Sequence, residues 1–180
     1  SEQQLRLFRD VDEMQAMINA SLEFFRDDAR LEEATSFDLA ELLRTLTDDY
    51  RDQSIDIAIS SPQHLVFFGR PMGIKRVVGN LLDNAVKYAQ EPTIELSADD
   101  QQVTLLVLDR GPGIAPESQE QVFAPFFRLE GSRNKNTGGV GLGLSAARAI
   151  VLGQGGTLTL CNRPDGGLEV KVLLPVLNGK

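Results

Sequence analysis

Apolar side chains recur through the first thirty residues of the chain at alternating spacings of four and three. The repeat is made by Leu7, Val11, Met14, Ile18, Ser21 and Phe25, and it is widened by Leu5, Phe8, Met17 and Leu22. A heptad repeat of this kind is typical of a helix that packs along its length against another helix. We therefore expect one long helix over residues 1–30 that pairs with a helix from another segment or a second chain. The alternative is that this helix packs on its own domain.

The heptad repeat breaks after residue 30, and a second helix start follows. Asp38 can cap this helix, Glu41 three residues later can reach back to the cap, and Phe37 can pack on Leu42 across the first turn. A globular domain is therefore expected to begin here. The expected division of the chain is a helix over 1–30, a linker over 31–36, a globular domain over 37–177 and a tail over 178–180.

The globular part mixes short apolar or alternating runs with helical patterns. Strands are predicted over 55–60, 64–68, 93–98, 103–109, 157–162 and 168–174. Turn-forming residues separate the third run from the fourth and the fifth from the sixth, which predicts antiparallel pairs. Helices are predicted over 72–89, over 116–122 and over 142–152, the last ended by Gly153. The class expected is α/β, a two-layer α/β sandwich whose mixed, mostly antiparallel sheet carries helices on one face.

Composition excludes several classes of protein. The 18 lysines and arginines face 26 aspartates and glutamates, and the resulting net charge of −8 argues against nucleic acid as a partner. Cys161 is the single cysteine, so an internal disulfide is impossible and a zinc site is not expected. No run approaches the ~18 apolar residues of a membrane span. Because Ser1 lies inside a helical pattern, we expect the chain to be a piece of a longer protein.

The predicted helix over 72–89 carries a polar stripe beside its apolar face. Asn80, Asn84 and Lys87 fall within a narrow sector at 100° per residue. Asparagine inside a helix is less favourable than alanine by several tenths of a kcal/mol, so two aligned asparagines need a reason. One interpretation is a solvated flank. The other is that amide oxygens bind Mg²⁺ while the lysine contacts phosphate.

A carboxylate ends the predicted strand over 103–109. Asp109 follows six apolar or alternating residues, and a buried carboxylate is unfavourable unless a donor meets it. Gly111 and Gly113 would let the backbone approach a flat ligand closely. An adenine suits such a site because its exocyclic amine is a donor. A polar turn after a strand is the alternative.

A third segment, residues 138–144, places several glycines at the start of a helix, where backbone N–H groups favour an anion such as phosphate. Its spacing fits neither the Rossmann fingerprint nor the P-loop, and protein-kinase motifs are missing. Residues 114–139 before it have the composition of a lid. Aromatic residues there precede a stretch, 126–137, in which three cations oppose one anion.

Together these segments resemble the N, G1, F and G2 boxes of bacterial sensor histidine kinases. The matching residues are 80–88, 109–113, 123–128 and 139–144. The resemblance covers residues 37–177 and implies the Bergerat ATP-binding fold. Residues 1–30 resemble the second helix of the family's dimerisation and phosphotransfer hairpin, which implies a homodimeric parent protein.

The resemblance also implies a binding site for ATP and Mg²⁺. Its catalytic residues would be Asn80, Lys87 and Arg128. Asn84 would bind Mg²⁺, and Asp109 would accept a hydrogen bond from adenine. Further nucleotide contacts would come from Tyr88, Gly111, Gly113, Ile114, Arg133, Gly139, Val140, Gly141, Leu142, Gly143 and Leu144.

The sole histidine does not match the family's phosphoacceptor, which lies on the first helix of the hairpin. His64 instead lies in a strand pattern, and we expect it to be structural or exposed. The chain should bind ATP without autophosphorylating alone. The γ-phosphoryl group of ATP would pass to a histidine on a hairpin outside this chain, and then to the receiver domain of a response regulator. The resemblance implies a cytoplasmic domain of a parent anchored in the bacterial inner membrane.

Other functions remain open. An ATPase that drives conformational change has the same fold, but such enzymes place a glutamate one turn before the metal-binding asparagine, where this chain has Asn80. A nucleotide-sensing module without catalysis would also lack the acceptor, although truncation explains that lack equally well. An anti-sigma-factor serine kinase also has these four sequence boxes, but the heptad helix before the domain argues against that class.

Overall fold

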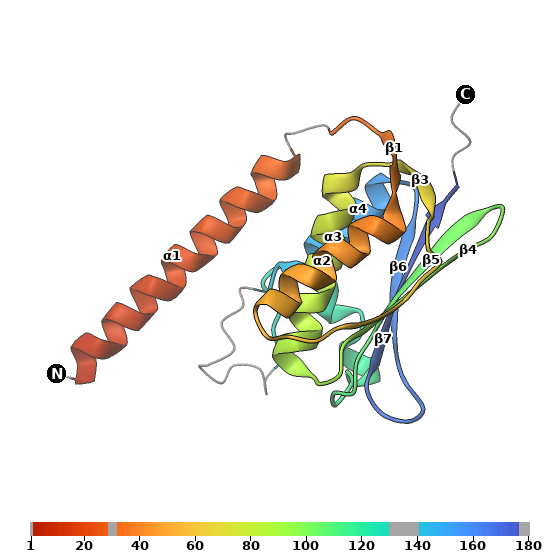
Figure 1. The fold of residues 1–180 in the computed structure, drawn as a ribbon. Coiled ribbons are helices and arrows are strands. Elements are labelled where there is room, and N and C mark those ends of the chain that lie inside the picture. The colour runs from red at the N-terminus through yellow and green to blue at the C-terminus, as the bar shows by residue number, and fades with distance from the viewer. Residues whose placement is uncertain (1, 29–31, 130–140, 177–180) are drawn as a thin grey trace.

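The computed structural model describes residues 2–28, 32–129 and 141–176. Its helices are α1 (Glu2–Asp28), α2 (Leu39–Asp52), α3 (Pro71–Tyr88) and α4 (Gly143–Gly153), with 3-10 turns η1 (Pro116–Ser118) and η2 (Gln121–Phe123). Its strands are β1 (Thr35–Asp38), β2 (Ala58–Ser60), β3 (Val66–Gly69), β4 (Thr93–Ala98), β5 (Gln102–Leu108), β6 (Thr157–Asn162) and β7 (Leu168–Pro175). Helix α1 stands apart from a body in which α2, α3 and α4 cover one face of a sheet (Figure 1).

The main sheet has the strand order β2-β4-β5-β7-β6. Strand β2 runs parallel to β4, and the other neighbours are antiparallel. The two expected hairpins, β4–β5 and β6–β7, are both present, and β1 and β3 form a separate antiparallel pair. The predicted two-layer α/β class with a mixed, mostly antiparallel sheet is confirmed.

Helix α3 is the central helix of the body and contacts both α2 and α4. Its buried residues are Ile74, Val77, Val78, Leu81, Leu82 and Ala85. Such positions typically stabilise a fold by ~1.5–3 kcal/mol for each large side chain buried. Pro71 occupies the first turn, where its missing N–H leaves no intrahelical bond unmade. Because one face of α3 is fixed against the sheet, the adjoining polar stripe has a defined direction.

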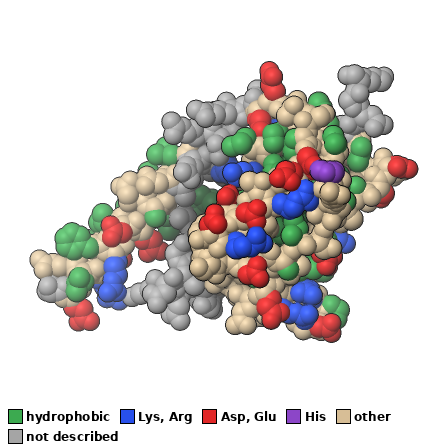
Figure 2. Space-filling view, viewed as in Figure 1, with side chains coloured by type: hydrophobic (Ala, Val, Ile, Leu, Met, Phe, Trp, Pro, Cys, Tyr) green, Lys and Arg blue, Asp and Glu red, His purple; other side chains and the backbone are tan. Residues whose placement is uncertain are grey.

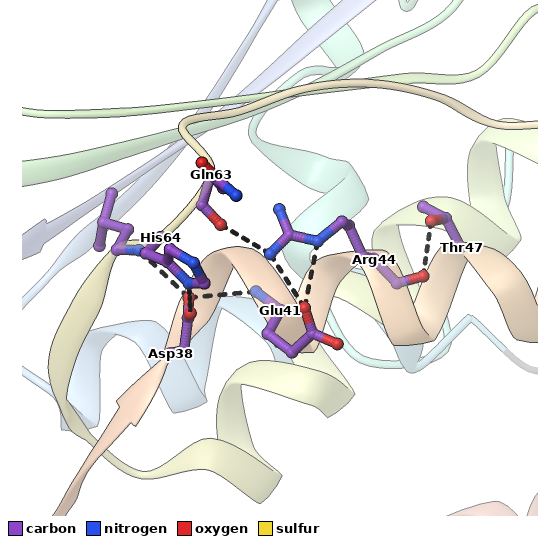
Figure 3. Close-up of polar contacts among 7 residues, drawn as sticks. Asp38, Glu41, Arg44, Thr47, Gln63 and His64 are labelled. Atoms are coloured by element: carbon purple, nitrogen blue, oxygen red, sulfur yellow. Dashed lines mark hydrogen bonds and ion pairs between the residues drawn. The ribbon is translucent and has the colours of Figure 1, made fainter.

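Helix α2 begins as predicted with Asp38 as its cap. The Asp38 carboxylate accepts hydrogen bonds from the backbone N–H of Glu41 at 3.2 Å and of Leu65 at 3.1 Å, and it lies 2.7 Å from Nδ1 of His64 (Figure 3). The hydrogen bond with His64, followed by the backbone bonds, lowers the pKa of Asp38 to about 2. His64 is exposed, as expected. Its contact with Asp38 links the segment before β3 to the start of α2.

One detail of that expected start is wrong. The Glu41 carboxylate does not reach back to the cap but pairs with Arg44 at 2.9 Å, and Arg44 also donates to the backbone oxygen of Gln63 at 2.7 Å (Figure 3). A nearby cation that is itself anchored outcompetes the backbone N–H as a partner for Glu41. Phe37 meets Phe67 edge to face, with ring centroids 6.0 Å apart.

Three elements differ from expectation. The segment 116–122 forms two 3-10 turns instead of one short helix. Val122 is the single buried residue of these turns, so the segment has no continuous apolar face that would stabilise a helix. Strand β1 begins at Thr35, inside the expected linker, and is too short for a visible alternation of apolar residues. Helix α4 ends at Gly153 as expected, but the left-handed residue that turns the chain is Gly155, at φ +77°.

The predicted long helix is present as α1, and its apolar repeat is exposed. Leu7, Val11, Met14 and Ile18 are 64%, 53%, 61% and 50% exposed. Figure 2 shows hydrophobic side chains at the surface along this helix. The apolar repeat therefore does not pack on the rest of the described chain. Within the described ranges, none of the helices has the length and apolar character needed to cross a membrane.

Candidate functional site

The second half of α3, the end of β5 and the start of α4 converge on one cavity of about 730 Å³. The residues expected from the sequence that line it are Asn80, Asn84, Lys87, Tyr88, Asp109, Gly113, Ile114, Arg128, Gly141, Leu142, Gly143 and Leu144. Gly111 lies in a shallow recess that adjoins the cavity at Lys87 and Tyr88. Three further expected residues, Arg133, Gly139 and Val140, lie outside the described residues, as do residues 130–139 of the expected lid.

The polar stripe of α3 faces the first residue of α4. The side-chain nitrogen of Asn80 donates to the backbone oxygen of Gly143 at 3.2 Å. A Cβ built on Gly143 would lie 3.9 Å from Oδ1 of Asn84. A side chain at position 143 would thus be in van der Waals contact with both asparagines, and the bond from Asn80 links α3 to the start of α4.

Asp109 lies at the edge of the core, 9% exposed, where β5 ends. Its Oδ1 accepts hydrogen bonds from the backbone N–H groups of Gly111 at 2.9 Å and Leu168 at 3.0 Å. Among the described residues, Oδ2 has no donor, although the carboxylate lines the cavity. A buried carboxylate with one oxygen satisfied by the protein is suited to accept from a ligand through the other.

The glycines after Asp109 are required mainly by neighbouring parts of the protein. A Cβ built on Gly111 would lie 2.6 Å from the Cβ of Ala89, at the end of α3. Gly113 has φ +71°, and its Cβ would lie 2.5 Å from Oδ1 of Asn162. Packing between this turn and the protein around it therefore requires both glycines, and the expected close approach of the backbone to a ligand stays a prediction.

The other end of the cavity is formed by the start of α4 and the aromatic segment before it. No described side chain caps α4. Gly141 has φ +81°, a region that favours glycine. Its backbone oxygen accepts from the N–H of Phe126 at 2.9 Å, and a Cβ there would lie 2.7 Å from the backbone oxygen of Phe127. Within the described part of the chain no side chain caps the first N–H groups of α4, an arrangement that suits an anion in the cavity.

Arg128 connects the cavity wall with α1. Its side chain is 21% exposed, and its Nη1 lies 3.9 Å from Oε1 of Glu13. Arg128 is thus at the cavity, as expected, and within ion-pair distance of the helix that precedes the domain. The sequence patterns did not indicate this contact, because neither residue belongs to an apolar repeat.

Sequence reasoning missed several residues at the site. Arg76 lines the cavity one helical turn before Asn80, and its spacing of four was the available signal. Asn162 and Arg163 contact the turn after Asp109 from the β6–β7 hairpin. No pattern indicated these two contacts, since asparagine and arginine beside a turn are common in hairpins.

Comparison with known proteins shows the family of the segment that forms this cavity. Residues 69–178 match the family described as histidine kinase-, DNA gyrase B- and HSP90-like ATPases. The chain belongs to this family. The match begins just before α3 and contains every element that forms the cavity. Members of such a family bind ATP, so the described cavity lies in an ATP-binding domain.

The similar proteins are sensor kinases. The sensor histidine kinase GtrS of Pseudomonas aeruginosa is 36% identical over 170 residues, which cover 94% of this chain and 35% of GtrS. The sensor protein RstB of Escherichia coli is 35% identical over 178 residues, which cover 94% of this chain and 41% of RstB. The chain therefore spans well under half of these relatives. It is the catalytic ATP-binding domain of a bacterial sensor histidine kinase, as the motifs predicted.

Solved structures agree with this assignment. The catalytic domain of the histidine kinase ThkA is 29% identical, with a TM-score of 0.69, and the match covers 80% of this chain and 96% of that domain. Full-length ShkA, 23% identical, matches all of this chain and 40% of its own length with a TM-score of 0.75, which shows a shared fold that includes the leading helix. The expected Bergerat-type fold is confirmed.

Proposed function

We propose that this domain binds Mg-ATP in the cavity and transfers the γ-phosphoryl group to a histidine on a separate helical hairpin, for relay to the receiver domain of a response regulator. The observation that carries the proposal is the convergence on one cavity of an amide stripe, a half-satisfied carboxylate and an uncapped helix start. These three features lie at positions suited to the metal, the adenine and the phosphates of one nucleotide.

Adenine recognition is assigned to Asp109. With Oδ1 held by two backbone N–H groups, Oδ2 accepts from the exocyclic amine of adenine. A guanine would present an oxygen at the same place, and two acceptors facing one another in a partly buried site are unfavourable. Tyr88 is 39% exposed at the cavity edge and flanks the nucleotide.

The donor set suits Mg²⁺. Magnesium uses few protein ligands and completes its shell with water and phosphate oxygens, so a single amide oxygen from Asn84 with Asn80 beside it is a sufficient protein contribution. The Asn80 amide is oriented by the oxygen of Gly143, which leaves its own oxygen available to the cavity. When bound, Mg²⁺ supplies neutralisation of charge on the phosphate oxygens during transfer.

The residues of the chain itself bind and orient the phosphates. The first N–H groups of α4 meet phosphate oxygens, and Lys87 and Arg128 bring positive charge to the same cavity. Arg133, Gly139 and Val140 are assigned to the same end from the sequence resemblance. Catalysis then consists mainly of holding the γ-phosphorus in line with the incoming imidazole nitrogen.

Phosphotransfer is favoured over ATP hydrolysis by the side chains around Asn80. Asp83 is the only acidic residue of α3, and Oδ1 of this residue accepts a 2.6 Å hydrogen bond from the hydroxyl of Tyr50. Burial, followed by this bond, raises the pKa of Tyr50, so the hydroxyl stays protonated and keeps donating to Asp83. A carboxylate engaged in this way is a poor general base for water.

The parent protein is proposed to be a homodimer joined through α1, the second helix of the phosphotransfer hairpin. The apolar repeat of α1 is exposed and requires a partner helix. We place this domain on the cytoplasmic side of a parent protein anchored in the bacterial inner membrane, where ATP and a receiver domain are both available.

The test is a transfer reaction in two parts. The chain is mixed with Mg-ATP labelled at the γ-phosphate and with a separate hairpin that carries a candidate histidine. Phosphate should accumulate on the hairpin in an acid-labile, base-stable form, and not on the hairpin with that histidine changed to glutamine. Release of free phosphate at an equal rate with and without the hairpin would instead favour an ATPase.

A further inference from the structure

The β6–β7 hairpin holds both ends of the turn that follows Asp109. Its own turn is closed by a backbone hydrogen bond from the N–H of Arg163 to the oxygen of Gly167 at 2.9 Å. At one end of the Asp109 turn, Arg163 donates through Nη1 to the backbone oxygen of Asp109 at 2.8 Å. At the other end, Asn162 contacts Ile114. Two adjacent residues of the hairpin therefore span the cavity wall from Asp109 to Ile114.

The Asn162 contact is a double hydrogen bond. Its Oδ1 accepts from the backbone N–H of Ile114, and its Nδ2 donates to the backbone oxygen of Ile114, both at 2.8 Å. A side-chain amide placed this way pairs with the backbone as a neighbouring strand would. Because both backbone groups of one residue are fixed, the direction of the chain at Ile114 is fixed as well.

Asn162 also accounts for the glycine next to Ile114. A Cβ on Gly113 would lie 2.5 Å from Oδ1 and 3.0 Å from Cγ of Asn162. The amide thus fills the space that a side chain at position 113 would need. Gly113 and Ile114 both line the nucleotide cavity, on the side where Asp109 lies.

We infer that Asn162 is a positioning residue for adenine binding, which acts by holding Gly113 and Ile114 in the shape that the base requires. The inference rests on the proposed nucleotide-binding function of the cavity. Asn162 does not itself line the cavity, so its effect on the ligand passes through the turn. Without the double bond, the turn must be ordered by the nucleotide, and that ordering weakens binding.

The experiment compares nucleotide dissociation constants by calorimetry at a temperature where every variant is folded by circular dichroism. Asn162→Leu removes both bonds at similar size and adds no charge. The expected result is a rise in Kd of about five- to tenfold for ATP, ADP and AMP alike, equivalent to about 1–1.4 kcal/mol, because binding must then also order the turn. The ratio of Kd values with and without Mg²⁺ should stay at the unsubstituted value, because the metal binds at the other end.

Gln119→Leu is the matched control. The side chain of Gln119 donates to the same Ile114 oxygen at 3.2 Å, but among the described residues that is its single hydrogen bond, and it lies five residues away on the same segment. We expect its Kd to change less than twofold. If Asn162→Leu does not fold, Asn162→Asp replaces it, because aspartate keeps the acceptor and loses the donor. Its Kd is measured for uncharged adenosine, on which the added charge has little effect.

The outcomes separate this inference from the proposed function. An unsubstituted chain that binds no ATP would overturn the proposed function. An unsubstituted chain that binds ATP, with unchanged Kd in the folded Asn162 variants, would overturn the positioning role alone. An equal loss in Gln119→Leu, or a loss of Mg²⁺ dependence in Asn162→Leu, would also contradict it.

Discussion

At the scale of single residues, the site depends on side chains whose two polar atoms have different partners. Asp109 offers Oδ1 to two backbone N–H groups and Oδ2 to the cavity, and Asn80 gives its nitrogen to Gly143. Asp109 and Asn80 were predictable as site residues from their motifs. Which oxygen or nitrogen faces the ligand was not, because that depends on Leu168 and Gly143, which lie far away in the sequence.

Asp109→Asn should weaken ATP binding while the domain stays folded. The new side chain can still accept both backbone bonds through its oxygen, but it then presents a donor to the adenine amine, and the mismatch is worth ~1–3 kcal/mol. Calorimetry measures the change in Kd, with the melting temperature as the control for folding. Equal ATP affinity in the variant and the original would remove Asp109 from adenine recognition.

Asn84→Ala should abolish Mg²⁺-dependent transfer to the added hairpin. Asn84 lies on the half-exposed stripe of α3 and not among its buried residues, so the substitution leaves the core intact. Alanine at this position also has a higher helix propensity. Transfer rates are measured at saturating ATP. A variant that transfers phosphate at an undiminished rate would show that the stripe is only a solvated flank.

The pair of His64 and Asp38 should make stability depend on pH in acid. The folded-state pKa of Asp38 is about 2 against a usual 3.8, so its contribution is complete above about pH 4 and is lost as the pH falls towards 2. Urea unfolding measured between about pH 5 and pH 2 should therefore show a smaller acid loss in His64→Ala than in the unchanged chain. Parallel curves for the two proteins would contradict this role of the pair.

At the scale of elements, the long helices and the hairpins followed from the sequence, whereas short elements did not. Helix α3 was predictable because its apolar residues repeat over five turns, and β6–β7 because a strong turn joins two alternating runs. Strand β1 and the turns η1 and η2 are three or four residues long, too short for any period. Their form is decided by contacts from elsewhere, as with Phe37 and Phe67.

The linker after α1 contributes to α3 in a way that the sequence did not indicate. Glu32 accepts from the backbone N–H groups of Met72 at 2.7 Å and Gly73 at 3.0 Å, while Arg70 provides no side-chain cap for the helix. Glu32 thus acts as a cap from forty residues away. A carboxylate at this end of a helix is favoured by both hydrogen bonding and the helix dipole.

Glu32→Ala should lower the free energy of unfolding by ~1 kcal/mol, because two N–H groups at the start of α3 lose their partner. Urea unfolding followed by circular dichroism measures the change. Glu33→Ala is the matched control, since Glu33 is exposed and next in sequence. If both variants lose the same stability, the cap contributes nothing in solution.

At the scale of the whole molecule, α1 carries an exposed apolar repeat and stands apart from the body that forms the ATP-binding domain. Several large apolar side chains on α1 are half exposed or more, and burial contributes about 25 cal/mol per Å² of apolar surface. We expect weak self-association that depends on concentration and disappears when the chain is shortened to begin near Glu32. Sedimentation equilibrium at several concentrations measures it. The same mass for both lengths at every concentration would contradict pairing through α1.

The central claim is that the cavity binds adenine at one end and Mg²⁺-coordinated phosphates at the other. The most direct measurement is calorimetric titration of the unsubstituted chain with ATP and with GTP, each with and without Mg²⁺. The account predicts saturable ATP binding that Mg²⁺ strengthens, and GTP binding weaker by at least about tenfold, as the loss of one buried hydrogen bond implies. Equal affinity for ATP and GTP, or ATP affinity that is indifferent to Mg²⁺, would contradict it.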